Sequence, residues 1–293
     1  MTGKTGHIII LIIIIVLAHV GQDIYAQGTD MGLVRKPGAF FGITAGPLKS
    51  NLIINEGTLD TESGSNSGRS FYGNLEAGYL ISKYFGFKSG IGYTSYSAEI
   101  SLYSYQDALM NRDSENESYE LRITASNINE SQSLKTMIIP LNIIINIPLG
   151  GIASIFVEPG MNLVIPVMKN YSNSGFFTYK GYYQEYNVLL ENLPLHDFSS
   201  NRLVNAEGDP ELKQTWLDAT VYSGLNIVIN PKLRLSGGFF YSRSVTDISG
   251  YKSRDEFHLS PSPGITNSLI GGADKVSTKA TGFSITLRYF ISR

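Results

Sequence analysis

The sequence contains no cysteine, and this absence removes several classes of protein at once. Without cysteine the chain has no disulfides, no thiolate metal site and no N-terminal cysteine that carries a lipid. Charge of either sign is also scarce, with 23 Lys and Arg against 25 Asp and Glu in 293 residues, a net charge of -2. A chain this close to neutral offers no electrostatic basis for binding nucleic acid. We therefore expect no nucleic-acid partner.

Catalytic and metal-binding motifs are lacking as well. Beyond the N-terminal segment the histidines are His196 and His258, and the chain has no HExxH or GxSxG motif. His196 lies beside Asp197 and near Ser199, a residue set that outer-membrane hydrolases place at the barrel rim, but a loop histidine beside an aspartate is more often simply solvated. The acidic run 113–120 lacks the ligand spacing and turn glycine of an EF-hand. We predict no enzyme, no cofactor and no metal, with a rim enzyme as the weakest alternative.

Long apolar runs are absent except at the N-terminus, where Ile8–Ala18 follows Lys4. This run is shorter than the ~20 residues of a membrane-spanning helix. Small Ala26 precedes Gln27 at a plausible cleavage point, so residues 1–26 are predicted to be a signal peptide rather than an uncleaved anchor. No other segment reaches the length of a spanning helix without polar interruption. If the protein spans a membrane, it must do so as a β-barrel.

What the sequence does contain is eight segments that alternate apolar and polar residues, the period of a β-strand. In the clearest segment, 280–291, Phe283, Ile285 and Leu287 share one face. The predicted strands are 39–48, 69–81, 86–100, 134–147, 153–168, 215–229, 233–245 and 280–291. Short turns at 82–85, 148–152 and 230–232 alternate with long polar loops at 49–68, 101–133, 169–214 and 246–279.

This alternation predicts an all-β fold, an eight-stranded antiparallel up-and-down transmembrane barrel with short periplasmic turns and four long extracellular loops. The barrel would occupy residues 39–293, preceded by a periplasmic segment at 27–38. Residues 169–214 are expected to hold a hairpin at 175–183 and a short helix near 186–193, and an extra hairpin there would raise the strand number to ten. The expected location is the outer membrane of a Gram-negative cell, with membrane lipid and the barrel assembly machinery as partners.

The inward faces of the predicted strands carry three acids and three bases: Glu76, Lys88, Glu158, Asp218, Arg234 and Arg288. Unpaired charges inside a barrel cost several kcal/mol each, so they are expected to pair. We predict that Glu76, Glu158, Arg234 and Arg288 form a network that plugs the lumen, because eight strands enclose only enough space for side chains. A narrow polar path is the alternative.

The longest loop is rich in tyrosine, at Tyr171, Tyr179, Tyr182, Tyr183 and Tyr186. Exposed tyrosines supply rigid amphipathic contact area and suit a protein or glycan partner. They are equally suited to packing the loop onto the barrel rim. Both interpretations remain open at this stage.

Several segments resemble the PorT-like outer membrane β-barrel proteins common in Bacteroidota. They are the F-G-I-T-A-G strand at 41–46, F-G-F-K-S-G-I-G-Y at 85–93, M-I-I-P-L at 137–141, V-E-P-G-M at 157–161 and the closing L-R-Y-F. The resemblance spans roughly residues 39 to 291. It implies an eight-stranded, OmpA-like barrel in the outer membrane and says little about biochemistry.

The sequence thus predicts a structural or binding protein that acts through its extracellular loops, and the resemblance allows a part in a secretion or surface assembly. A minor channel or solute-binding porin is the alternative. The closing aromatic stretch resembles the C-terminal signal for barrel insertion, from which Ser292 and Arg293 depart.

Overall fold

The computed structural model describes residues 37–55, 64–150, 152–250 and 257–291. The predicted signal peptide (1–26) and most of the predicted periplasmic segment (27–38) lie outside these residues. In the described part of the chain, no helix has the length and hydropathy needed to cross a membrane.

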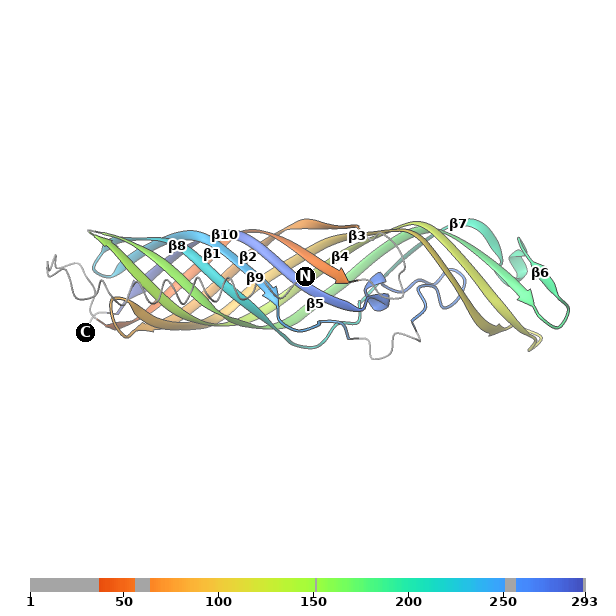
Figure 1. Cartoon of the computed structure of the whole chain (residues 1–293), viewed down its shortest axis with the longest axis horizontal. Coiled ribbons are helices and arrows are strands. Elements are labelled where there is room, and N and C mark those ends of the chain that lie inside the picture. Colours follow the sequence, from red (N-terminus) through yellow and green to blue (C-terminus); the bar gives the residue numbers. More distant parts are fainter. Residues whose placement is uncertain (1–36, 56–63, 151, 251–256, 292–293) are drawn as a thin grey trace. The chain divides into compact units, whose positions relative to one another are not determined.

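The described residues form ten strands and two short 3-10 helices. The elements are β1 (Gly38–Asn55), β2 (Gly64–Leu80), β3 (Phe85–Arg112), β4 (Ser118–Gly150), β5 (Ala153–Tyr183), β6 (Val188–Leu190), η1 (Pro194–His196), β7 (Ser199–Gly208), β8 (Trp216–Asn230), β9 (Leu233–Ser244), η2 (Leu269–Gly272) and β10 (Lys275–Phe290). Eight of the strands pair antiparallel in the closed order β1-β2-β3-β4-β5-β8-β9-β10, because β4 pairs with β5 and β10 returns to β1 (Figure 1). The predicted eight-stranded antiparallel barrel is confirmed.

The period-two alternation of the sequence determines the two faces of the barrel wall. In β10 the side chains of Phe283, Ile285 and Leu287 are exposed, whereas Ser284, Thr286 and Arg288 are buried. The other ring strands repeat this arrangement, so the outer surface is a band of apolar and aromatic side chains. Its exposed members include Phe41, Ile43, Leu75, Tyr79, Phe87, Ile91, Met137, Leu141, Ile143, Met161, Leu163, Leu225, Leu235, Phe239 and Tyr289.

Short turns join β2 to β3, β4 to β5 and β8 to β9, all at the end of the barrel where β1 begins and β10 ends. The turn after Asn230 is held by its side-chain Oδ1, which accepts hydrogen bonds from the backbone N–H of Lys232 and Leu233, both at 2.9 Å. We call this the turn end of the barrel and the opposite end the loop end. The long connections all lie at the loop end, as the sequence predicted.

The loop end departs from the sequence prediction, because three ring strands continue far past the others (Figure 1). Residues 101–133, predicted to be a loop, form the outer parts of β3 and β4, which stay paired out to Arg112 and Ser118. Residues 169–183 likewise continue β5. The segment 175–183 is therefore one strand rather than a hairpin, and 186–193 contains β6 instead of the predicted short helix. Strands β6 and β7 pair with β5 outside the ring, so the barrel keeps eight strands.

This projecting sheet, formed by the outer parts of β3, β4 and β5 together with β6 and β7, is called the extension. One of its faces is apolar and carries Leu121, Ile123, Phe177 and Tyr179, which are buried in the main hydrophobic cluster. The same cluster contains Leu259, Leu269 and Ile270 from the segment 257–273, which therefore covers this face. The opposite face of the extension is polar next to the barrel and carries exposed Phe176 and Leu203 further out.

Candidate functional site

Four inward charges form a closed ion-pair network across the lumen. Lys88 Nζ lies 2.8 Å from Glu76 Oε2 and 2.7 Å from Glu158 Oε2. Arg288 closes the cycle, with Nε 2.5 Å from Glu76 Oε1 and Nη2 2.7 Å from Glu158 Oε1. These four side chains come from β2, β3, β5 and β10 and are each less than 5% exposed. The two cations and the two anions thus neutralise one another inside the barrel, at the level where these four side chains meet.

Small and aromatic residues make room for this network. Strand β1 has Gly42 at the same level, where an added Cβ would lie 2.9 Å from Glu76 Oε1 and 3.1 Å from Arg288 Cγ. The Tyr222 ring lies 5.0 Å from Lys88 Nζ, and the Phe40 ring lies 5.3 Å from the guanidinium carbon of Arg288. These rings add cation-π contacts to the ion pairs.

The structure does not bring all six predicted lumenal charges together. Asp218 is fully buried but accepts hydrogen bonds from the hydroxyls of Tyr96, Ser242 and Thr278, at 3.1, 3.1 and 3.3 Å. The side chain of Arg234 points to Phe290, with its guanidinium carbon 5.0 Å from the centre of that ring. It makes no ion pair with a described carboxylate. The predicted place of Arg234 in the network is therefore corrected, since Lys88 occupies it.

Apolar layers lie on both sides of the ion-pair network. Towards the loop end the rings of Tyr72, Tyr222 and Phe240 pack with centroids 5.3 to 6.1 Å apart, and the Tyr222 hydroxyl donates to Tyr72 Oη at 3.1 Å. Towards the turn end Phe40, Leu80, Ile144 and Phe290 form a separate buried cluster. The ion pairs hold the strands of the wall together. The apolar layers on both sides exclude water from the charged groups.

Most of the loop tyrosines considered as a binding surface are buried or half-buried. Tyr179 is fully buried, and its hydroxyl bonds Ser260 Oγ at 2.9 Å. Tyr183 is buried and donates to Asp113 Oδ2 at 2.9 Å, and half-buried Tyr171 donates to the Thr266 carbonyl at 3.0 Å. Tyr186 is exposed, and Tyr182 is half-buried under the guanidinium of Arg122. The packing interpretation thus describes three of the five rings.

The residues considered as candidates for catalysis or metal binding contact other residues of the protein. The imidazole of His196 stacks on Phe198 with centroids 5.8 Å apart, and among the described contacts none joins His196 to Ser199. Nδ1 of His258 pairs with Asp107 Oδ2 at 2.7 Å. In the acidic run, Asp113 Oδ1 accepts from the backbone N–H of Glu115 and Glu117, at 3.0 and 2.9 Å, and so closes the turn between β3 and β4.

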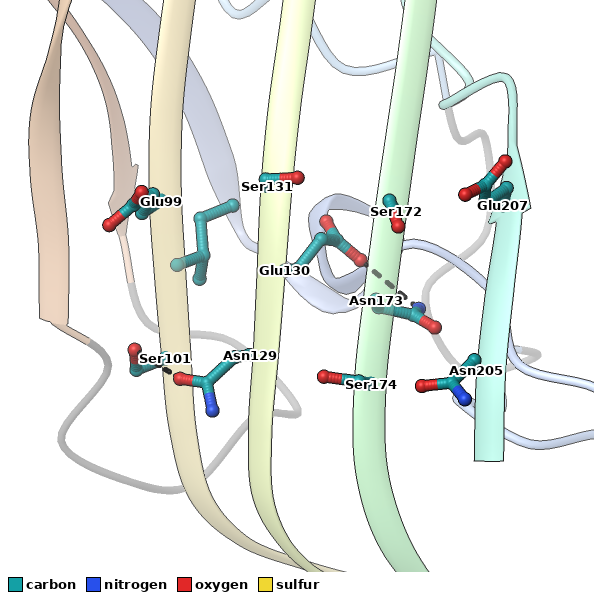
Figure 2. Close-up of a pocket in the computed structure, with 11 residues that line it drawn as sticks. Glu99, Ser101, Asn129, Glu130, Ser131, Ser172, Asn173, Ser174, Asn205 and Glu207 are labelled. Carbon is teal, nitrogen blue, oxygen red and sulfur yellow. Dashed lines mark hydrogen bonds between the residues drawn. The ribbon is translucent and has the colours of Figure 1, made fainter. Parts of the chain in front are cut away.

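A polar groove lies on the uncovered face of the extension, just beyond the barrel. It spans β3, β4, β5 and β7 and has a volume of about 610 Å³. Two cross-strand rows line it, Glu99-Ser131-Ser172-Glu207 and Ser101-Asn129-Ser174-Asn205, and Figure 2 shows both rows crossing the four strands. A second hollow of about 440 Å³ adjoins it at Ser133, Asn170 and Asp209. Hydroxyls, amides and outlying carboxylates therefore share one concave face.

A buried carboxylate on the other face of the same sheet fixes the groove strands to the covering segment. Glu130 accepts hydrogen bonds from Ser268 Oγ at 2.8 Å, the Leu269 N–H at 2.9 Å and Asn173 Nδ2 at 3.3 Å. Figure 2 shows Glu130 and Asn173 joined in this way. Burial raises the pKa of the Glu130 carboxyl, although the hydrogen bonds it accepts act in the opposite direction. The strands that form the groove are thus fixed on their opposite face by hydrogen bonds to the covering segment.

The groove residues were not predicted from the sequence, although a signal for them is present. Serine and asparagine occupy every second position at 129, 131 and 133 and again at 170, 172 and 174. This is the period of a strand with one polar face. The intervening buried positions 130, 132 and 173 hold Glu, Gln and Asn instead of apolar residues, so these segments resemble loops in the sequence.

No family model matches the chain, and no curated protein sequence matches it, so the PorT-like resemblance stays a prediction. Solved structures do resemble it, and among them are small outer-membrane β-barrel proteins. The outer membrane protein OprG from Pseudomonas aeruginosa is 12% identical, with 89% of this chain and 99% of that chain covered and a TM-score of 0.40.

Neisserial surface protein A is 13% identical, with 86% of this chain and 97% of that chain covered and a TM-score of 0.33. Ail, the attachment invasion locus protein of Yersinia pestis, is 11% identical, with 86% and 99% covered and a TM-score of 0.31. At these identities and TM-scores the likeness carries no information about ligand or function.

Proposed function

We propose that this protein is an outer-membrane β-barrel that binds a polyhydroxylated extracellular ligand, a surface glycan, in the polar groove of its extension. The location is supported by the apolar outer band. Along β10 and the residue that follows it, this band runs from Phe283 to Ile291, a span of about 27 Å at ~3.4 Å per residue. At the ~35–45° tilt of such barrels this length projects to roughly 20 Å along the membrane normal, comparable with their ~25 Å apolar band.

The single observation that carries the binding function is the pair of cross-strand polar rows in the groove. Serine hydroxyls and asparagine amides both donate and accept hydrogen bonds, and Glu99 and Glu207 accept them with a full charge. A sugar presents alternating hydroxyl donors and acceptors, which this set of side chains satisfies. Exposed Phe176 and Leu203, paired across β5 and β7 beside the rows, supply an apolar patch for the face of a sugar ring.

The lumen favours the binding function over the alternative of a solute channel. An open path would have to pass the ion-pair network and the Tyr72, Tyr222 and Phe240 rings, all of which are buried. Rim catalysis has even less support, because His196 and His258 are engaged in separate contacts.

The proposal is tested by measuring glycan binding by the refolded full chain on an array of bacterial and host polysaccharides. Replacing Ser131 with tryptophan fills the centre of the groove and should abolish binding. Replacing Thr124 with tryptophan is the matched control, because Thr124 is exposed on the same strand further from the barrel. Binding that is unaffected by Ser131→Trp rejects the groove, and binding of a protein but no glycan rejects the ligand class.

A further inference from the structure

A second feature of the barrel wall lies away from the groove, where the outer apolar band ends. We consider four neighbouring ring strands, β2, β1, β10 and β9. Along each of them, from the turn end towards the loop end, the first outward-facing side chain that carries a charge is a cation. These residues are Arg69, Lys49, Lys279 and Arg243, and all four side chains are exposed. They are called the cation quartet.

The quartet consists of two like-charged cross-strand pairs. Lys49 lies opposite Arg69, and Lys279 lies opposite Arg243. Strands β1 and β10 bring the pairs together, since Lys49 faces Thr281 and Lys279 faces Asn51. Like charges directly opposite one another on a sheet are destabilising. Within the described residues no member of the quartet has an ion-pair partner, so none of these residues offsets the cost.

An apolar groove begins directly beneath the quartet. It has a volume of about 630 Å³, and its lining includes Lys49 and Arg69 at one end and Pro47, Phe239, Thr281 and Phe283 below them. The Phe239 and Phe283 rings meet edge to face with centroids 5.6 Å apart and are both exposed. At the groove, the ladder between β1 and β10 has no paired residues at Gly46 and Pro47. The wall is therefore hollowed where apolar surface meets positive charge.

We propose that the cation quartet and this groove form a binding site for a phosphorylated, acylated lipid of the outer leaflet. The phosphate would lie between the paired cations, where arginine can donate two hydrogen bonds to it and lysine adds a point charge. An acyl chain would occupy the groove against Phe239 and Phe283. The anion relieves the repulsion within each pair, and the chain covers aromatic surface at the height of the lipid tails.

This inference rests on the outer-membrane location given under the proposed function, but it is independent of the glycan groove. It also differs from general attraction to a charged surface, because it requires phosphate and acyl chain in one molecule. Basic residues near a membrane surface contribute about 1 kcal/mol each. Loss of two of them is therefore expected to weaken retention of the lipid roughly tenfold or more.

The test uses the full chain in nanodiscs and counts retained lipids by native mass spectrometry. The probes are diphosphorylated lipid A, the same lipid without phosphates, and inorganic phosphate. Wild type should retain the diphosphorylated lipid at least tenfold better than the phosphate-free lipid, and inorganic phosphate should not displace it. The double variant Lys49→Gln with Arg69→Gln should lose this preference, and Thr281→Trp, which fills the groove without changing charge, should weaken retention.

The matched control is Lys83→Gln with Lys232→Gln, which removes the same charge from the turn end. Equal retention of the two lipids by wild type, no change in the Lys49 and Arg69 variant, or an equal loss in the control overturns the proposal. Unaltered retention by Thr281→Trp, or displacement by inorganic phosphate, rejects the groove as the acyl site. Heat-modifiable gel migration in phospholipid alone reports insertion separately, so failure of the location and failure of the lipid site are distinguishable.

Discussion

At the scale of single residues, the lumen shows how inward charges on different strands are matched. The two carboxylates, Glu76 and Glu158, each contact both cations, Lys88 and Arg288. This cyclic arrangement leaves no carboxylate dependent on one partner alone. The cost of removing one cation is therefore shared by both carboxylates.

Replacing Arg288 with glutamine is expected to destabilise the barrel by about 3–5 kcal/mol, because two buried carboxylates then share the single charge of Lys88. The measurement is urea unfolding in detergent micelles, followed by the mobility of unheated protein on a gel. Lys232→Gln is the control, since Lys232 is exposed in a turn. A loss below about 1 kcal/mol in Arg288→Gln would show that the network adds no more than exposed ion pairs do.

The inward parity of all six lumenal charges could be predicted from the sequence, but their partners could not. Parity follows from the period of two along each strand. Pairing depends on the height of each residue in the barrel, which is set by the register between strands. Arg234 and Arg288 lie directly opposite one another on β9 and β10, yet Arg288 points to the carboxylates and Arg234 to Phe290. The sequence does not indicate that the side chains of these two arginines point to different partners.

At the scale of elements, the extension is the main departure from the predicted topology. Its strands do alternate, as at Leu121, Ile123 and Ala125, but the alternation changes phase within them. The register between β4 and β5 shifts between Ser126 and Asn129, where Asn127 adopts a positive φ of 52°, and again between Lys135 and Thr136. A bulge of this kind moves the following side chains to the opposite face. The bulge therefore interrupts the alternation on which a strand prediction depends.

The attachment of the segment 257–273 to the extension is expected to depend on pH through Glu130. Since burial raises the folded-state pKa of this carboxyl, the folded arrangement favours the protonated form. Its contribution to stability is fully present below the ordinary pKa of 4.5 and is lost as the pH rises through the raised folded value. Hydrogen-exchange protection factors of 257–273 should fall over that range.

Replacing Glu130 with glutamine supplies the control for this prediction. The amide imitates the neutral acid, so its protection factors should remain constant over the same range of pH. Identical pH profiles of wild type and Glu130→Gln would contradict the role assigned to Glu130.

At the scale of the whole barrel, the eight-stranded ring, the filled lumen and the apolar outer band are consequences of one another. Eight strands enclose a space that side chains fill, and here charged, polar and aromatic groups fill it in layers. The sequence predicted this architecture because the turns and the alternation act along the entire chain. The polar groove was not predictable, because it depends on how four strands are brought side by side.

The filled lumen predicts the electrical behaviour of the reconstituted protein. In planar bilayers the wild type is expected to insert without a stable, large open conductance, because the ion-pair network and the Tyr72, Tyr222 and Phe240 layer block the path. Heat-modifiable migration of the same preparation verifies that it is folded. A persistent large conductance from folded protein would contradict the plugged lumen and favour the channel alternative.

The pairing of β1 with β10 has a consequence for how the protein is made. The seam that closes the ring joins residues near the two ends of the barrel sequence, such as Phe40 with Phe290 and Ile43 with Leu287. No partial chain lacking β10 can complete the ring, so closure must follow synthesis of the whole barrel. Contacts this distant in sequence also form slowly. Until the ring closes, the unpaired edges of β1 and β9 are exposed strand edges of the kind that aggregate, so the topology itself makes the incomplete barrel vulnerable.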